Sequence, residues 1–146
     1  MLSYIGGKSR IAPQLIIPNI PTDIENFVEV KNILQSKYKN EFAVLILEEM
    51  SFKTQLRYFA RCSILIGIMG SGLLNAIFMP CKGMVITNTT DSYLSRVCEL
   101  RKHQLVTCTS HSFKYRGKTT WRVDTEQLIE LVGSLHCCYD VATTID

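Results

Sequence analysis

The sequence has no long apolar run and little net charge. No apolar stretch reaches the ~18 residues of a membrane-spanning helix, because the longest, residues 63–69, has the length of a strand. The formal net charge of +3 over 146 residues is too weak to imply nucleic acid or an anionic membrane as a partner. The first ten residues lack the pattern of a secretory signal. We therefore expect a cytoplasmic protein without a membrane span.

Paired metal ligands are also missing. The six cysteines include no C-x-x-C pair. A zinc site would have to combine Cys108 and His111 with distant partners at 136–138, whereas structural zinc sites bring paired ligands at close spacing. We therefore expect no metal site. There is no D-x-D motif, and a metal requirement for any reaction stays open.

Proline is scarce after the first part of the chain. Three of the four prolines fall within the first 21 residues, where Gly6 and Gly7 also lie. Proline and glycine interrupt regular structure, so we expect short elements and turns in this part. The polar residues 31–40 form either a linker or an exposed helix.

Regular elements alternate from Phe42 onward. Short apolar runs predict buried strands at 42–47, 63–68, 84–86 and 105–108. Helical spacing and capping residues predict helices after Ser51, over 73–79, over 91–102 and from Asp124 to about residue 135, with Gln127 completing the last cap. The order favours an α/β fold: a Rossmann-like, mostly parallel sheet of about four strands with flanking helices.

The most informative segment is a glycine turn between a buried strand and a helix. Gly67, Gly70 and Gly72 follow the apolar run 64–66 and precede the helix. Glycines let a backbone approach a phosphate, and a helix start offers free N–H groups, so a diphosphate fits such a turn. The spacing G-x-x-G-x-G is not that of a dinucleotide site, and Thr87 and Asn88 stand where an acidic residue is expected. The alternative is that these glycines only permit close packing.

Three segments around this turn resemble family 61 glycosyltransferases. They are SFKTQ at 51–55, CSILIG at 62–67 and MGSGLLNAIFMP at 69–80. The family shows an S-F-x-x-Q helix start, an apolar strand and an H-G-A-G-L-x-N-x-x-F-x-P turn and helix, in this order and spacing. The similarity continues more weakly to residue 135.

The resemblance implies transfer of a sugar from a nucleotide sugar to a glycan or protein acceptor. The fold would be the donor-binding half of a GT-B-type architecture, with the nucleotide sugar as a substrate and no tightly bound cofactor. Ser51 and Gln55 would support the loop before them. The donor-binding residues would be those of the glycine turn: Gly67, Met69, Gly70, Ser71, Gly72, Leu73 and Asn75.

Met69 departs from the family pattern. It stands where the family has histidine, and a thioether neither exchanges protons nor donates to a phosphate. No catalytic residue can therefore be named. Two alternatives to an active enzyme stay open, a non-catalytic nucleotide-binding or interaction module and a remnant DNA adenine methyltransferase.

The first residues carry the methyltransferase resemblance. The segment YIGGKSRIA at 4–12, with Phe27 to Glu29, resembles the opening of DNA adenine methyltransferases, but the cofactor loop and the D-P-P-Y signature do not follow. A fused gene would explain both resemblances. We expect a methyltransferase-like fragment at 1–29, a junction at 30–41, the Rossmann-like domain at 42–136 and a tail at 137–146.

Several remaining residues have a structural and a functional interpretation. The charged group at Arg96, Arg101, Lys102 and His103 is expected to be a solvated face. Residues 111–120 are expected to form a basic loop, whose cations could reach a donor phosphate: Lys114, Arg116, Lys118 and the neighbouring Arg122. Glu48 and Glu49 follow a strand, where either a polar loop or a catalytic acid fits. Cys62, Cys81 and the single Trp121 are expected in the core.

Overall fold

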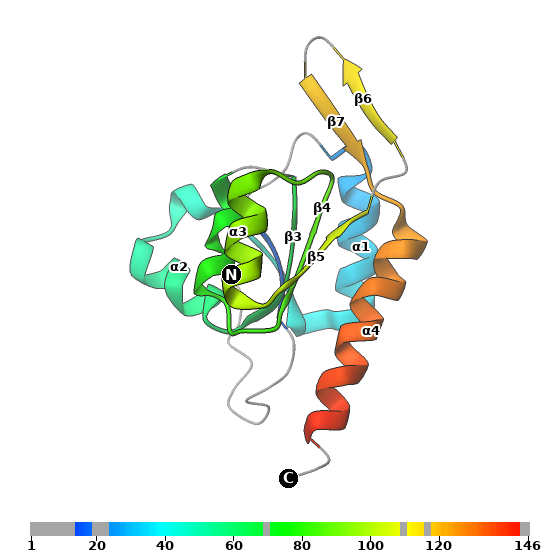
Figure 1. Cartoon of the computed structure of the whole chain (residues 1–146). Helices are drawn as coiled ribbons and strands as arrows, with labels where there is room; N and C mark the ends of the chain where they lie inside the picture. The colour runs from blue at the N-terminus through cyan, green and yellow to red at the C-terminus, as the bar shows by residue number, and fades with distance from the viewer. Residues whose placement is uncertain (1–13, 19–23, 69–70, 109–110, 116–117, 144–146) are drawn as a thin grey trace.

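Five parallel strands form the central sheet of the protein (Figure 1). The computed structural model describes residues 14–18, 24–68, 71–108, 111–115 and 118–143. The strands lie in the order β2-β1-β3-β4-β5. Their bounds are β1 Gln14–Pro18, β2 Phe42–Leu45, β3 Cys62–Gly67, β4 Met84–Thr87 and β5 Gln104–Thr107. The predicted α/β fold with a mostly parallel sheet is confirmed, and all four predicted strands are present.

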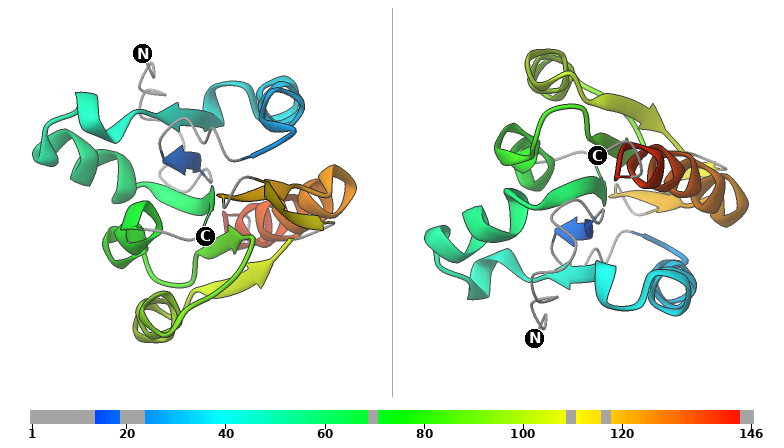
Figure 2. Two further views of the ribbon diagram at one scale, coloured as in Figure 1. Left: turned by 90° about the horizontal axis from the view of Figure 1, so that it is seen from above. Right: turned by 90° about the horizontal axis from the view of Figure 1, so that it is seen from below.

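Helices cover both faces of the sheet, which makes three layers (Figure 2). The helices are α1 Phe27–Tyr38, α2 Phe52–Phe59, η3 Ser71–Phe78, α3 Ser92–Arg101 and α4 Thr125–Thr143, with short 3₁₀ turns η1 Lys39–Glu41 and η2 Leu47–Glu49. Helices α1 and α4 pack on one face, whereas α2, η3 and α3 pack on the other. The side chains of each strand alternate between the two cores, as in Leu15 and Ile17 against Ile16.

Strand β1 is the one described strand of the central sheet that the sequence did not predict. It lies between β2 and β3, in register with Phe42–Leu45 on one side and with Ile64 and Leu65 on the other. Its residues Leu15, Ile16 and Ile17 are fully buried. The short apolar run between Pro13 and Pro18 therefore supplies an inner strand of the same sheet that the later elements form.

Residues 31–40 are mostly helical. Helix α1 buries Val30, Leu34 and Tyr38, which follow one another at a spacing of four residues, against the sheet. At the other end of the chain, α4 continues beyond the predicted stop near residue 135, through Cys137 and Cys138 to Thr143. Of the cysteines expected in the core, Cys62 is buried, but Cys81 is exposed, which corrects that prediction.

The prediction of a loop over residues 111–120 is wrong. The segment forms an antiparallel hairpin of β6 His111–Tyr115 and β7 Lys118–Arg122, which projects beyond the ends of the sheet strands (Figure 1). The prediction failed because the segment is rich in polar and charged residues, as loops are. A strand that lies outside the core can have the same composition. Trp121 at the end of β7 is buried as predicted, and its Nε1 donates to Cys108 O at 2.7 Å.

Because the five strands are parallel, the sheet has two chemically different edges. We call the edge where the strands begin the amino edge, and the edge where they end the carboxyl edge. The turns before β2, β3, β4 and β5 lie at the amino edge, and the glycine turn after β3 lies at the carboxyl edge. In Figure 1 the carboxyl edge is at the top, below the hairpin. Ligands of open α/β sheets generally bind at the carboxyl edge.

Candidate functional site

The last residue of β3 is a glycine because the strand end and η3 pack closely there. A Cβ atom on Gly67 would lie 3.1 Å from Leu73 Cδ2 and 3.6 Å from Pro18 Cδ. Leu73 is buried and belongs to the core on the η3 face of the sheet. The alternative reading of the glycines, close packing of strand and helix, therefore accounts for Gly67.

The first turn of η3 is held by its own side chains. Asn75 is half-buried, and its Nδ2 donates to Gly72 O at 3.0 Å. Leu73 turns its side chain into the core, so only its main chain can face a ligand at the carboxyl edge. The predicted residues Met69 and Gly70 lie outside the described residues, as does the side chain of Ser71.

The loop after β2 is supported as the sequence predicted. Gln55 Nε2 donates to Leu47 O at 2.8 Å and to Met50 O at 3.1 Å, across the loop that contains η2. Ser51 caps α2 by accepting from Thr54 N at 3.2 Å. These bonds fix the path of the loop that leads into α2, and α2 packs against η3.

The end of β4 presents neutral oxygen groups and a capped helix. Thr87, which pairs in register with Gly67, is buried, and its Oγ1 donates to Asn88 Oδ1 at 3.2 Å. Asp91 caps α3, and its carboxylate accepts from Leu94 N at 2.7 Å. Two neighbouring strand ends, those of β3 and β4, thus supply the polar atoms nearest to the candidate site.

Residues 20–86 match the family model Glycosyltransferase 61. The match covers a little under half of the chain and supports the resemblance that the motifs indicated. It includes α1, β2, α2, β3, the glycine turn and β4 as far as Ile86. It begins after β1, so it leaves out residues 1–19 of the expected methyltransferase-like fragment but includes residues 20–29, with Phe27 to Glu29. No curated protein matches the chain.

The segments that directly follow the sheet strands, at the carboxyl edge, carry carboxylates and no basic residues. The sequence that directly follows the five strands, at 19–26, 46–51, 68–70, 88–91 and 108–110, contains no Lys or Arg. It contains five carboxylates: Asp23, Glu25, Glu48, Glu49 and Asp91. A bound diphosphate would therefore depend on backbone N–H groups, or on cations from the hairpin.

The hairpin brings positive charge to this edge. Arg122 of β7 forms an ion pair with Glu25 at 3.4 Å, and both side chains are about half exposed, so the pair adds little stability. The other basic residues that the sequence offered for a donor phosphate are Lys114, Arg116 and Lys118. Arg116 and the side chains of the two lysines lie outside what the structure describes.

The far end of η3 is anchored by a histidine that the sequence placed on a solvated face. His103 is buried, its Nδ1 accepts from Gly83 N at 2.9 Å, and its Nε2 lies 2.8 Å from Ala76 O. Since Nδ1 accepts a hydrogen bond, the proton of the neutral ring is on Nε2, which donates to Ala76 O. Burial lowers the pKa of His103 below its usual value, and the nearby Arg101 guanidinium acts in the same direction, against the bond to Ala76.

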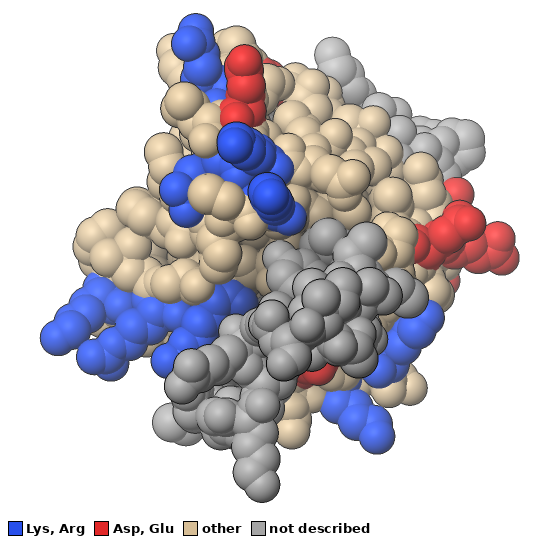
Figure 3. Space-filling model, turned by 60° about the horizontal axis from the view of Figure 1, so that its bottom comes forward, with Lys and Arg blue, Asp and Glu red and all other residues tan. Residues whose placement is uncertain are grey.

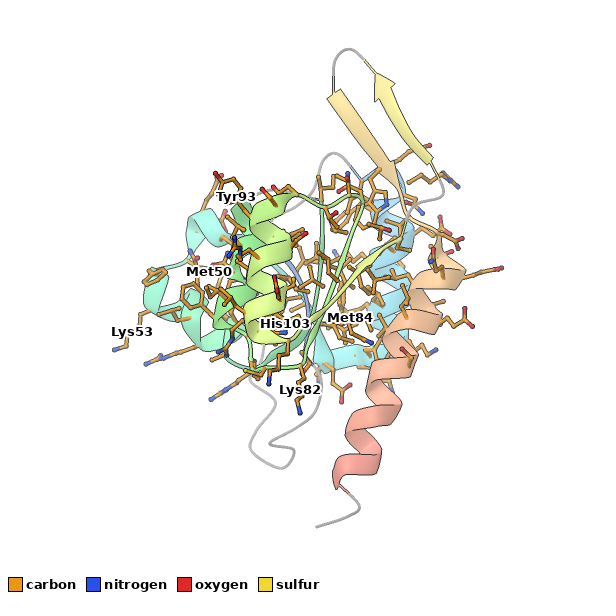
Figure 4. The ribbon with its side chains drawn as sticks, viewed as in Figure 1. Met50, Lys53, Lys82, Met84, Tyr93 and His103 are labelled. Carbon is orange, nitrogen blue, oxygen red and sulfur yellow. The ribbon has the colours of Figure 1, made fainter. Side chains whose placement is uncertain are left out.

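Arg101, like His103, does not lie on the solvated face that the sequence predicted. It is half-buried, and its Nη2 donates to Met79 O at 2.7 Å. Arg96 and Lys102 are exposed as predicted. The helix that begins at the glycine turn is thus fixed at its other end by two side chains from the end of α3 and the turn after it. Figure 4 shows His103 near the amino edge, on the same side of the molecule as Lys82.

Metal ligands do not cluster in the described part of the chain, where no group of three His, Cys, Asp or Glu side chains comes together. Cys108 is buried beside Asp124, and burial raises the pKa of its thiol to about 11. The side chains of its supposed partners, His111 and residues 136–138, are not among those described. Among the described helices, none is long and apolar enough to cross a membrane.

Proposed function

We propose that the chain binds a nucleotide sugar at the carboxyl edge, over the glycine turn between β3 and η3, and serves transfer of the sugar to a glycan or protein acceptor. The match of residues 20–86 to the Glycosyltransferase 61 family carries this proposal. The donor is a substrate in this proposal and not a resident cofactor. The sheet corresponds to the donor-binding half of a GT-B-type enzyme.

The geometry of the glycine turn supports a diphosphate contact. The start of η3 offers backbone N–H groups at a helix N-terminus, where the peptide dipoles favour an anion. Asn75 holds this turn through Gly72, and Gly67 lets η3 lie close to the strand end. The polar groups of Thr87 and Asn88 lie at the next strand end, within the same edge.

A second candidate is a nucleotide-binding or interaction module without catalysis. Two observations favour it. Met69 replaces the histidine of the family motif, and the segments that follow the strands carry five carboxylates and no cation. Both features weaken transfer chemistry more than the fold, because a backbone turn can hold a nucleotide without a proton-exchanging side chain.

A thermal-shift and calorimetric titration of the purified chain tests the proposal. The panel contains UDP-sugars and GDP-sugars, with S-adenosylmethionine as the control for the methyltransferase-like opening. A donor present at a hundred times its dissociation constant would stabilise the fold by about 2.7 kcal/mol. Incubation of the stabilising donor with acceptor glycans and proteins then separates the enzyme from the module, because only an enzyme forms a glycosylated product.

A matched pair of variants locates the site. Asn75→Ala removes the bond to Gly72 O and should weaken donor binding, whereas Asn40→Ala, an exposed residue of η1 at the opposite edge, should not. A folded protein that binds no donor in the panel would contradict the proposal. Stabilisation by S-adenosylmethionine alone would replace it with the methyltransferase alternative.

A further inference from the structure

The amino edge of the sheet is basic, in contrast to the carboxyl edge. Each described turn that leads into a sheet strand carries an exposed cation: Lys39 before β2, Arg61 before β3, Lys82 before β4 and Lys102 before β5. We call these four residues the basic turns. Glu41 is the one carboxylate in these turns. The net charge of +3 therefore conceals a difference between the two edges, because the turns before the strands carry cations and the segments directly after them carry carboxylates.

Three of these cations occupy backbone positions that suit glycine better. Lys39, Lys82 and Lys102 have φ values of 50°, 68° and 58°. Left-handed backbone disfavours every residue with a Cβ atom, and glycine is the usual residue at the end of a helix such as α3. A lysine at each of these positions weakens the fold and keeps a positive charge at the edge. Strain of this kind is a reason to look for a function.

Exposed apolar side chains accompany the cations. Leu100, beside Arg101 and Lys102, is 67% exposed. Ile77 and Phe78 at the end of η3, just before the turn with Lys82, are 41% and 39% exposed. Figure 3, in which the lower side of Figure 1 comes forward, shows groups of Lys and Arg on the described surface, with Asp or Glu beside some of them and uncharged surface beside others.

We propose that the amino edge of the sheet binds the surface of an anionic phospholipid bilayer through the basic turns and the neighbouring Leu100. Strands of one sheet lie about 4.8 Å apart, so cations at the starts of neighbouring strands form a row that a flat surface can meet. Three of the four residues of the basic turns are lysines. The ammonium group of lysine is a compact charge, and it lacks the planar guanidinium geometry with which arginine recognises bases or phosphates through two hydrogen bonds. Apolar side chains among the cations suit the lipid interface and not a nucleic-acid backbone.

Bound in this way, the protein would turn its carboxyl edge away from the bilayer. The candidate donor site and the hairpin would then face the aqueous phase, at the opposite end of the strands. The lipid contact does not depend on nucleotide-sugar binding, and each can be measured without the other.

Co-sedimentation of the whole chain with vesicles tests the proposal. One preparation contains phosphatidylcholine with phosphatidylserine, and the other contains phosphatidylcholine alone. We expect binding to the mixed vesicles only, with a loss on raising the salt concentration, because surface charge is screened. Equal binding to both preparations, or binding to neither, would overturn the proposal.

A double variant removes the charge without harming the fold. Lys82→Gly with Lys102→Gly relieves two left-handed positions and should weaken binding to the mixed vesicles about twenty-five-fold, since each basic residue near such a surface contributes about fivefold. The exchange of the same two residues for arginine should preserve most of the binding. The matched control is Lys31→Gly with Arg96→Gly, on the exposed surfaces of α1 and α3, with thermal melts to establish that it is folded. A glycine double variant that binds as tightly as the unmodified chain would disprove the role of the basic turns.

Leu100→Ser distinguishes a bilayer from nucleic acid. It should reduce vesicle binding several-fold, because a 67% exposed leucine can enter the interface of the bilayer. If the unmodified chain instead binds a DNA duplex more tightly than the mixed vesicles, and Leu100→Ser changes neither affinity, the basic edge is a nucleic-acid surface and the lipid proposal is wrong.

Discussion

The two edges of the sheet differ in the residues that form their turns. At the carboxyl edge the chain uses glycine, asparagine and backbone groups, with carboxylates around them and no Lys or Arg directly after any sheet strand. At the amino edge it places lysine even where the backbone is left-handed. Net charge and composition therefore say little about how charge is distributed over the surface of a parallel α/β fold. The chain direction sorts the turns into two sets, and each set has its own chemistry.

The largest expected effect is loss of the fold when the N-terminal segment is removed. A fragment of residues 42–146 lacks β1, which separates β2 from β3 in the sheet, and it loses the buried Leu15, Ile16 and Ile17. We expect no cooperative thermal transition and little amide dispersion in NMR spectra. Adding a peptide of residues 1–41 should restore part of the structure. A fragment that melts as the whole chain does would show that β1 is dispensable and that the division at Phe42 is a true domain boundary.

The next effect concerns the histidine at the amino edge. His103→Leu leaves Gly83 N–H and Ala76 C=O without their partner in a buried place and should cost about 2–4 kcal/mol in the free energy of unfolding. Urea denaturation measures this cost. Gln104→Leu, at the exposed next position, is the matched control and should change little. Equal, small effects of both changes would mean that η3 does not depend on His103.

The same histidine makes stability depend on pH. The pKa of His103 is lower in the folded protein than its usual value of 6.5, so below that value the unfolded chain binds more protons. The contribution of His103 is therefore complete above pH 6.5 and falls as the pH decreases toward the folded pKa. Thermal melts between neutral pH and about pH 5 should show this fall, and His103→Gln should lose that part of it. A melting temperature with the same pH dependence in both proteins would contradict the assignment.

A smaller effect is expected at the carboxyl edge. Asn26, just before α1, donates from Nδ2 to Val123 O and accepts at Oδ1 from Val123 N, both at 2.9 Å. Asn26→Ala should cost about 1–3 kcal/mol, because two buried backbone groups lose their partner. Asn32→Ala on the exposed side of α1 is the matched control. Denaturation midpoints that coincide would show that water replaces the Asn26 bonds without cost.

The smallest effect has the opposite sign. Lys102→Gly at the left-handed end of α3 should stabilise the protein by about 0.5–1 kcal/mol. Lys37→Gly, in the last turn of α1, should destabilise it by a similar amount, since glycine there only adds freedom to the unfolded chain. If both changes destabilise, the lysines of the amino edge are not strained, and one reason for the proposed lipid surface disappears.

The sequence predicted the elements whose pattern is local. Whereas the edge strand β5 has only two apolar residues, the runs at β2, β3 and β4 are mostly apolar because helices cover both faces of the sheet, and this is visible without tertiary contacts. Strand β1 has the same character, but its run is short and flanked by prolines, so only its pairing with β2 and β3 identifies it. The hairpin was not predicted because its strands lie outside the central sheet and contain polar residues, so they lack the apolar runs of buried strands.

The place of the glycine turn in the fold was predictable, and its contacts were not. The order of strand, glycine turn and helix placed it at the end of β3. The packing of Gly67 against Leu73 and Pro18 could not be read from the sequence, because Pro18 belongs to a strand that had not been recognised. His103 was hidden by its charged neighbours, and its contacts with Gly83 and Ala76 come from elements distant in the chain.

Amide NMR spectra of the whole chain, recorded during titration with the nucleotide sugar that stabilises it most, test whether the donor binds at the glycine turn. We expect shifts of the amides of residues 67–75 and of Thr87 and Asn88 at the carboxyl edge, with Lys82 and Lys102 unchanged. Shifts centred on the basic turns, or no shifts with any donor, would contradict a nucleotide-sugar site at the glycine turn.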